Sequence, residues 1–209
     1  MGGEGMTERQ IIFSGPMVRA LLAGRKSQTR RVVKPQPKTE GLTGVYADLY
    51  DHGPEWAFWL PDNRMTEPRT WACPYGIPGD RLWVRETWGR VGIPERIVYR
   101  ANPADDYQWG PGRPSQGDFR WRPSIFMPRN LSRLTIELTA VRVERVQDIS
   151  GEDAQAEGWP REQDLFPSVN TGSKARLWYE RLWDSLNAKR GFPWASNPWC
   201  WALTFKRLP

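Results

Sequence analysis

The feature that most constrains the fold is a long strand pattern at residues 132–146, SRLTIELTAVRVERV. Apolar residues occupy even positions from Leu134 to Leu138, and odd positions at Val141 and Val143. Alternation with a period of two predicts a β-strand with one buried face. The change of phase predicts one extra residue after Leu138, as at a β-bulge or a barrel corner. We therefore expect a long, bent strand in a strongly curved sheet.

The N-terminal part predicts a strand followed directly by a helix. Residues 11–13 are β-formers, Ser14 is a suitable N-cap, and Pro16 is tolerated in the first helical turn because its missing N–H would be unpaired there. Gly24 can adopt the left-handed conformation that ends a helix. The basic stretch GRKSQTRR at 24–31 therefore begins where this helix ends.

Further elements follow from local patterns. Residues 81–88 form a strand pattern that puts Glu86 on the same side as its apolar neighbours, unless Trp83 marks the buried face instead. We also expect a strand at 96–101, a short capped helix from Ser150 to Glu157 ended by Gly158, and a last strand at 199–205. A longer helix is expected at 173–191, and its predicted apolar face is Ala175, Trp178, Leu182 and Leu186.

The chain of 209 residues is long enough for one sizeable core. Residues 1–8 are expected to be a flexible N-terminus and 9–209 a single domain. Proline and glycine recur at about 34–79 and 102–120, which predicts two loop-rich insertions. The order of elements predicts an α+β fold, a small closed β-barrel with flanking helices.

Composition narrows the function classes. The net charge of +6 favours an anionic partner such as nucleic acid or a nucleotide. Two cysteines and one histidine are too few for a zinc site, so no metal or other cofactor is expected. The N-terminus lacks the apolar region of a signal peptide, no stretch approaches 18 apolar residues, and the low cysteine content fits a reducing compartment. A cytoplasmic location without membrane contact is expected.

Two positions attract attention for their chemistry. Lys26 precedes Thr29 by three residues, and an activated threonine needs a base close by, such as a lysine whose pKa is lowered by desolvation or by neighbouring cations. Taken alone, the stretch is more typical of a solvated or phosphate-facing basic turn. Glu157 ends its helix, where the macrodipole disfavours an anion by up to about 1 kcal/mol, so helix stability does not explain its place. On this pattern alone an ordinary surface glutamate is still the favoured interpretation.

The chain resembles the ASCH family, whose members have PUA-like β-barrels, and in particular its larger bacterial and phage-borne members. Four segments carry the resemblance: LLAGRKSQTRR at 21–31, GDRLWVRETW at 79–88, WRPSIFMPRNLSRLTIELTAVRVERVQDIS at 121–150, and NPWCWALTFKR at 197–207. Together they cover most of the chain outside the two insertions.

The resemblance implies an activity. Some small members of the family hydrolyse N4-acetylcytidine to cytidine with a lysine, a threonine and a glutamate at places that match Lys26, Thr29 and Glu157. It thus implies an amidohydrolase acting on N4-acylated cytidine or cytosine nucleosides. Thr29 would attack the acyl carbonyl, Lys26 would take its proton, and Glu157 would assist; in an alternative, Glu157 activates water directly. Arg31, Glu86 and Arg129 are further hypotheses for substrate binding. This chain departs from those members in its length and in having Arg30 beside the threonine.

A second function class remains open, a PUA-like module that binds RNA or single-stranded DNA, with or without ribonuclease activity. It is favoured by the positive charge, by 13 tryptophans that can stack on bases, and by the arginines at positions 129, 133, 142 and 145. Ribonuclease chemistry ranks lowest, because the chain has neither a histidine pair nor a carboxylate cluster suited to metal ions.

Overall fold

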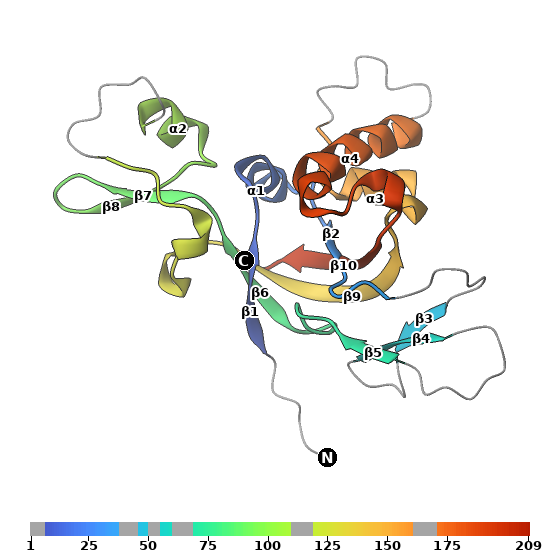
Figure 1. Cartoon of the computed structure of the whole chain (residues 1–209). Helices are drawn as coiled ribbons and strands as arrows, with labels where there is room; N and C mark the ends of the chain where they lie inside the picture. Colours follow the sequence, from blue (N-terminus) through green and yellow to red (C-terminus); the bar gives the residue numbers. More distant parts are fainter. Residues whose placement is uncertain (1–6, 38–45, 50–54, 60–68, 110–118, 161–170) are drawn as a thin grey trace.

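The computed structural model of the chain describes residues 7–37, 46–49, 55–59, 69–109, 119–160 and 171–209 (Figure 1). Its α-helices and β-strands, in chain order, are β1 (Glu8–Ile12), α1 (Gly15–Leu22), β2 (Gln28–Val32), β3 (Tyr46–Leu49), β4 (Glu55–Trp59), β5 (Arg69–Ala72), β6 (Arg81–Arg85), β7 (Trp88–Val91), β8 (Arg96–Tyr99), α2 (Pro103–Trp109), β9 (Thr135–Arg145), α3 (Gly151–Ala156), α4 (Thr171–Asn187) and β10 (Trp199–Arg207). The predicted α+β class is confirmed.

A five-stranded sheet forms the centre, in the order β1-β6-β9-β10-β2. β1 runs parallel to β6, and the other neighbours are antiparallel. Along the β9–β10 ladder Thr204 pairs with Ala140 and Phe205 with Leu138, so Thr139 is the extra residue. The phase change in the sequence therefore marks a real β-bulge, which bends the long strand as expected.

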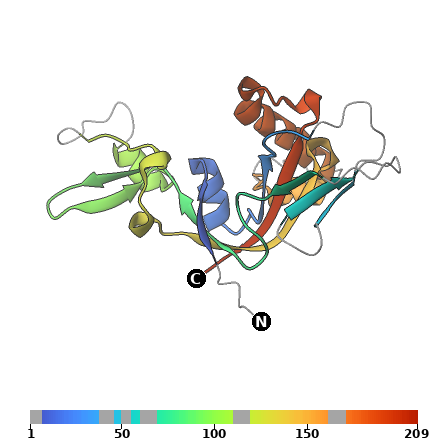
Figure 2. The same cartoon turned by 60° about the horizontal axis from the view of Figure 1, so that its bottom comes forward.

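The sheet is buried on both faces. One core contains Ile11, Leu82, Ile136 and Leu203. On the other face α3 and α4 pack around a second core that contains Ala175, Tyr179, Trp183 and Cys200, and both views show these helices on one side of the sheet (Figures 1 and 2). β10 is consequently apolar on both sides.

The expected closed barrel is wrong. β1 and β2 are the two edges of the sheet, and no backbone ladder joins them. Side chains occupy the place of that ladder: the Phe13 ring lies 5.4 Å from Lys26 Nζ and also 5.4 Å from the Arg31 guanidinium carbon. Arg31 then donates a hydrogen bond of 2.7 Å to the carbonyl of Ile12 on the facing edge. The sheet is open at this point because bulky side chains keep the two edge strands apart.

Both insertions contain regular structure. Strands β3, β4 and β5 form a small antiparallel sheet within 34–79, and α2 lies within 102–120. This small sheet and the β7–β8 hairpin with α2 lie at opposite ends of the molecule (Figures 1 and 2). β1 begins at Glu8, inside the segment expected to be flexible, while residues 1–6 and His52 lie outside the described residues.

The longest helix is rotated relative to the predicted face. Its buried residues are Ala175, Tyr179 and Trp183, whereas Leu186 is 43 % exposed. Trp178 and Leu182 of the predicted face are only partly buried against the second core, whereas the rings of Tyr179 and Trp183 are fully within it. Burial of these two rings therefore sets which side of α4 faces the sheet. Among the described residues, no helix combines the length and apolar character needed to cross a membrane.

Candidate active site

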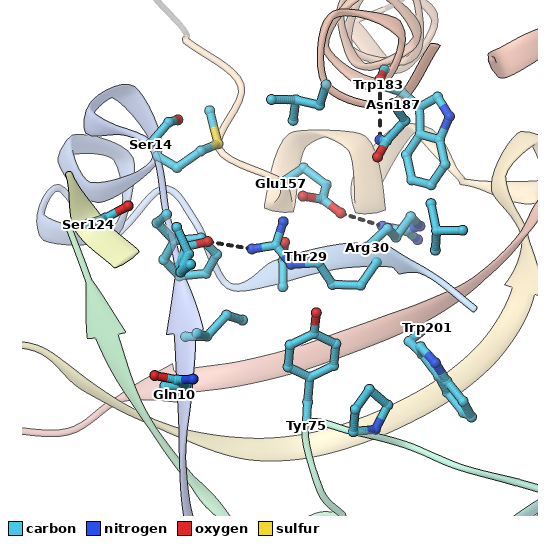
Figure 3. A pocket seen from close by; sticks show the side chains of 18 of the residues that line it. Gln10, Ser14, Thr29, Arg30, Tyr75, Ser124, Glu157, Trp183, Asn187 and Trp201 are labelled. Atoms are coloured by element: carbon cyan, nitrogen blue, oxygen red, sulfur yellow. Dashed lines mark hydrogen bonds and ion pairs between the residues drawn. The ribbon is translucent and has the colours of Figure 1, made fainter. Parts of the chain in front are cut away.

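A pocket of about 1120 Å³ opens at the gap between β1 and β2 (Figure 3). Residues of β1 and β2 line it, together with the end of α3 and the C-terminal half of α4. Lys26, Thr29 and Glu157 are all among the lining residues, and each is only 3 % exposed. The structure thus brings together in one pocket the three residues that the sequence suggested for catalysis.

Local backbone geometry positions Lys26 against Glu157. Gly24, with φ of 69°, ends α1, and the chain then runs antiparallel to the end of α3, where Lys26 and Glu157 form an isolated β-bridge. Gly158 follows with φ of 103°, and a Cβ there would lie 2.9 Å from the Cβ of Ala20. Glycine is required at this position because the backbone passes directly beside α1 and adopts a left-handed conformation.

The Lys26 ammonium or amine makes two hydrogen bonds, both to Glu157. Nζ donates to the Glu157 carbonyl at 2.7 Å and to Oε2 at 2.9 Å. A neutral amine has two N–H bonds and one lone pair. If these two hydrogen bonds use both N–H bonds, the lone pair is left to accept a proton, and this geometry therefore suits a lysine that acts as a general base.

The electrostatics around Lys26 favour its neutral form. Complete burial lowers the pKa of Lys26 below its ordinary value, and Arg31 and Arg30 lower it further, against the opposing effect of the Glu157 carboxylate. Lys26 therefore releases its proton at lower pH than an exposed lysine.

Arg30 organises the carboxylates behind the pocket. Its side chain is fully buried, and its nitrogens contact Glu144 Oε1 at 2.7 Å, Asp153 Oδ2 at 2.8 Å and Glu157 Oε1 at 3.2 Å. Burial alone would lower the pKa of Arg30, but Glu157 and Glu144 raise it above its ordinary value. Glu157 is thus held at both oxygens, by Arg30 on one side and Lys26 on the other, which fixes its carboxylate.

The hydroxyl of Thr29 is available to a ligand. Thr29 pairs with Leu203 of the neighbouring strand, and its side chain lines the pocket, near Arg30 and Glu157 in Figure 3. Within the described part of the chain, no hydrogen bond engages this hydroxyl, and it is not among the fully enclosed polar atoms without a partner. A nucleophile must be free in this way to reach a substrate.

The three residues suggested for substrate binding lie in different places relative to the pocket. Arg31 lines the pocket and spans its two edge strands. Glu86 is buried, as its apolar neighbours suggested, but it forms a two-pronged ion pair with Arg133 at 2.8 and 3.0 Å and does not line the pocket. Arg129 is half exposed, pairs with Glu8, and also lies outside the pocket lining. The structure therefore supports a place at the pocket for Arg31 alone.

Sequence reasoning missed the role of Arg30 and of its partners Glu144 and Asp153. Arg30 follows Thr29 in a β-strand, so it points to the opposite face, where alternation predicts either solvent or a second core. The sequence offered little signal for its partners: Glu144 is one of several charged residues of β9, and Asp153 is explained by its place in the first turn of α3, where an anion is favourable.

Among the described residues, no group of three or more histidine, cysteine, aspartate or glutamate side chains is placed to hold a metal ion. What the arrangement offers is a lysine of lowered pKa, a free hydroxyl, a fixed carboxylate and an arginine around one cavity. Comparisons with models of protein families, with curated protein sequences and with solved structures found no match for this chain.

Proposed function

We propose that this protein is an amidohydrolase that removes the acyl group from N4-acylated cytidine or cytosine nucleosides. The observation that carries the proposal is the convergence of Lys26, Thr29 and Glu157 on one pocket, with Lys26 buried and hydrogen-bonded to Glu157. The resemblance of the sequence to the ASCH family supplies the substrate class. The open sheet would then correspond to a PUA-like barrel in which the two edge strands, β1 and β2, do not pair.

In the proposed reaction, the neutral amine of Lys26 takes the proton of the Thr29 hydroxyl while Oγ1 bonds to the acyl carbon. The carbonyl oxygen becomes an oxyanion, for which Arg31 at the pocket wall is a candidate cation. As the intermediate collapses, the bond between the acyl carbon and N4 breaks, and N4 receives the proton from the Lys26 ammonium. Cytidine leaves, and the acyl group remains as an ester on Thr29.

Water then cleaves the ester. Its oxygen bonds to the acyl carbon, its proton passes to Lys26 or to Glu157, and the bond to Thr29 Oγ1 breaks, which releases the carboxylic acid and restores the hydroxyl. In the alternative route Glu157 activates water directly, and Lys26 and Thr29 polarise the carbonyl. Neither route requires a metal or an organic cofactor.

The decisive experiment measures release of cytidine from N4-acetylcytidine and from analogues with larger acyl groups. We expect turnover by the wild type, its loss in Thr29→Val, and partial recovery in Thr29→Ser, which restores a hydroxyl. Lys26→Met and Glu157→Gln should each lower kcat by about 10²–10⁴-fold, the usual contribution of a positioned acid or base. Accumulation of an acyl ester on Thr29, detected by mass spectrometry, would separate the two routes.

A matched control lies elsewhere on the sheet. Lys206 and Glu137 form an ion pair of the same kind at 2.7 Å, but on an exposed surface away from the pocket lining. Lys206→Met and Glu137→Gln should leave turnover unchanged. A wild type that hydrolyses none of these acyl groups would refute the proposal.

The alternative of a nucleic-acid-binding module has weaker support from its arginines. Each of the four arginines that suggested it has a protein partner: Arg129 pairs with Glu8, Arg133 with Glu86, Arg142 with Asp153, and Arg145 with the Asn197 carbonyl. They are therefore less available to phosphates than the sequence suggested. The two buried thiols fit a cytoplasmic location, which remains part of the proposal.

A further inference from the structure

The pocket extends well past the residues of the proposed reaction. From Thr29 its lining follows β2 and continues to Lys34, and it also takes in Leu186, Arg190 and Phe192 at the end of α4 and beyond. Its volume of about 1120 Å³ lies above the range of roughly 300–1,000 Å³ that encloses drug-sized ligands. An acylated base alone would leave much of this space unused.

The charges of the lining are unbalanced at the Lys34 end. Both carboxylates that line the pocket are already neutralised: Glu8 pairs with Arg129, and Glu157 pairs with Lys26 and Arg30. Lys34 and Arg190, which also line it, form no ion pair with any carboxylate in the described ranges. Lys34 and Arg190 therefore add uncompensated positive charge to the lining away from the reacting centre.

Lys34 and Arg190 are both exposed, and Lys34 lies against a ring whose backbone is held in place by hydrogen bonds. Lys34 Nζ lies 5.3 Å from the centre of the Phe192 ring. The backbone of Phe192 is tied to α4 twice: its carbonyl accepts from Trp183 Nε1 at 2.9 Å, and its N–H donates to the Asn187 carbonyl at 3.2 Å. Trp183 and Asn187 lie beside Glu157 and Arg30 in Figure 3, so α4 connects the two ends of the pocket.

We infer that Lys34 and Arg190 form a subsite for the phosphate of a cytidine nucleotide. In a nucleotide the ribose separates the phosphate from the base, which matches a pocket with its reacting groups at one end and two free cations at the other. Arginine and lysine together are the usual partners of phosphate oxygens. This inference rests on the proposed function for the base end of the pocket, and it specifies the substrate as a nucleotide rather than a free nucleoside.

The experiment compares cytidine with cytidine 5′-monophosphate as ligands of the full chain by isothermal titration calorimetry. We expect the nucleotide to bind at least about tenfold more tightly, as two charge-assisted contacts would provide, and the difference to shrink with added salt. Lys34→Gln and Arg190→Gln should each reduce the preference, and the double variant should abolish it. Lys189→Gln is the matched control, because Lys189 is an exposed cation on the same short helix, Ala188–Arg190, that does not line the pocket.

Two further ligands identify the source of the phosphate. Cytidine 3′-monophosphate and a short oligonucleotide containing one cytidine, tested on the same variants, distinguish a mononucleotide from a polymer as the source of the phosphate. Binding of either ligand that depends on Lys34 and Arg190 supports the subsite. Equal binding of cytidine and its monophosphate would overturn the inference, as would an equal effect of Lys189→Gln.

The phosphate subsite and the proposed hydrolysis can be refuted separately. A phosphate preference that depends on Lys34 and Arg190 in a protein that does not cleave N4-acetylcytidine would leave the subsite standing and refute the proposed function. Cleavage with equal efficiency of N4-acetylcytidine and its 5′-monophosphate would refute the subsite alone.

Discussion

Replacing Arg30 by methionine should destabilise the protein far more than replacing Arg142, although both arginines contact Glu144 and Asp153. Arg30 is fully buried and pairs with Glu144, Asp153 and Glu157. Arg142 contacts Glu144 and Asp153 with its side chain 42 % exposed. The two arginines thus share two carboxylate partners and differ in burial and in the additional contact of Arg30 with Glu157.

The expected magnitudes follow from that difference. Removing one partner of a buried ion pair costs about 3–5 kcal/mol, because a buried charge loses its compensation. Here Glu157 loses its arginine and keeps Lys26, whose neutral form burial favours. An exposed pair contributes about 1 kcal/mol or less, because water replaces the lost partner. For a domain of this size each kcal/mol shifts Tm by about 2–4 °C, so Arg30→Met should lower Tm by roughly 6–20 °C.

The assay is urea denaturation at neutral pH, followed by circular dichroism, for the wild type and both variants. Adding Glu157→Gln to Arg30→Met should recover part of the lost free energy of unfolding, since the second change removes the buried carboxylate charge that Arg30 balances in the wild type. Equal free energies of unfolding for Arg30→Met and Arg142→Met would refute the reasoning.

Three other properties follow from the described contacts. Folding lowers the pKa of Lys26 from 10.5, so between the folded-state pKa and 10.5 the unfolded chain binds more protons than the folded chain. The contribution of Lys26 to stability therefore rises with pH in that range. The difference in free energy of unfolding between wild type and Lys26→Met, measured by urea denaturation at several pH values, should increase in favour of the wild type as pH rises, and a constant difference would contradict this. Gly158→Ala should destabilise the protein by roughly 1–3 kcal/mol because its backbone is left-handed, and by more because the new Cβ would contact Ala20. Gly24→Ala, with open space around it, should show only the backbone effect, so thermal melts should give the smaller loss of stability for Gly24→Ala. Burial raises the pKa of the Cys200 thiol, so this residue should resist alkylation in the native protein and react only in denaturant; rapid labelling of the native chain would show that the thiol is accessible.

Local patterns predicted the elements that depend on neighbouring residues. The bulge at Thr139 was visible as a change of phase, and the cap at Ser150 as a side chain that accepts from the Asp153 N–H at 3.0 Å. Closure of the sheet could not be predicted in this way, because it depends on how far Phe13 and Arg31 hold the edge strands apart. The face of α4 was wrong for a similar reason: the periodicity fits two neighbouring stripes, and contact with the sheet selects between them.

The residues of the candidate site that are close in sequence could be predicted together. Contacts between residues far apart in sequence could not, because they depend on the fold. Lys26 and Thr29 are close in sequence, and Glu157 was noticeable as an anion at the wrong end of a helix. Glu86 and Arg129 carry equally suggestive charges, but each finds a partner that the sequence did not identify, Arg133 and Glu8. A charged residue belongs to the site only if the fold brings it to the pocket, and the local sequence does not determine this.

The pairing of Lys26 with Glu157 links residues 131 positions apart in the chain. Bringing together residues so far apart has a cost in loop-closure entropy, and the pair has no counterpart in an N-terminal fragment that ends before α3. A ribosome-bound chain, or one nicked and separated before α3, would lack the carboxylate that holds the lysine in place. The arrangement of the pocket thus depends on the fold from α1 to α3 and not only on the segment that contains Lys26 and Thr29.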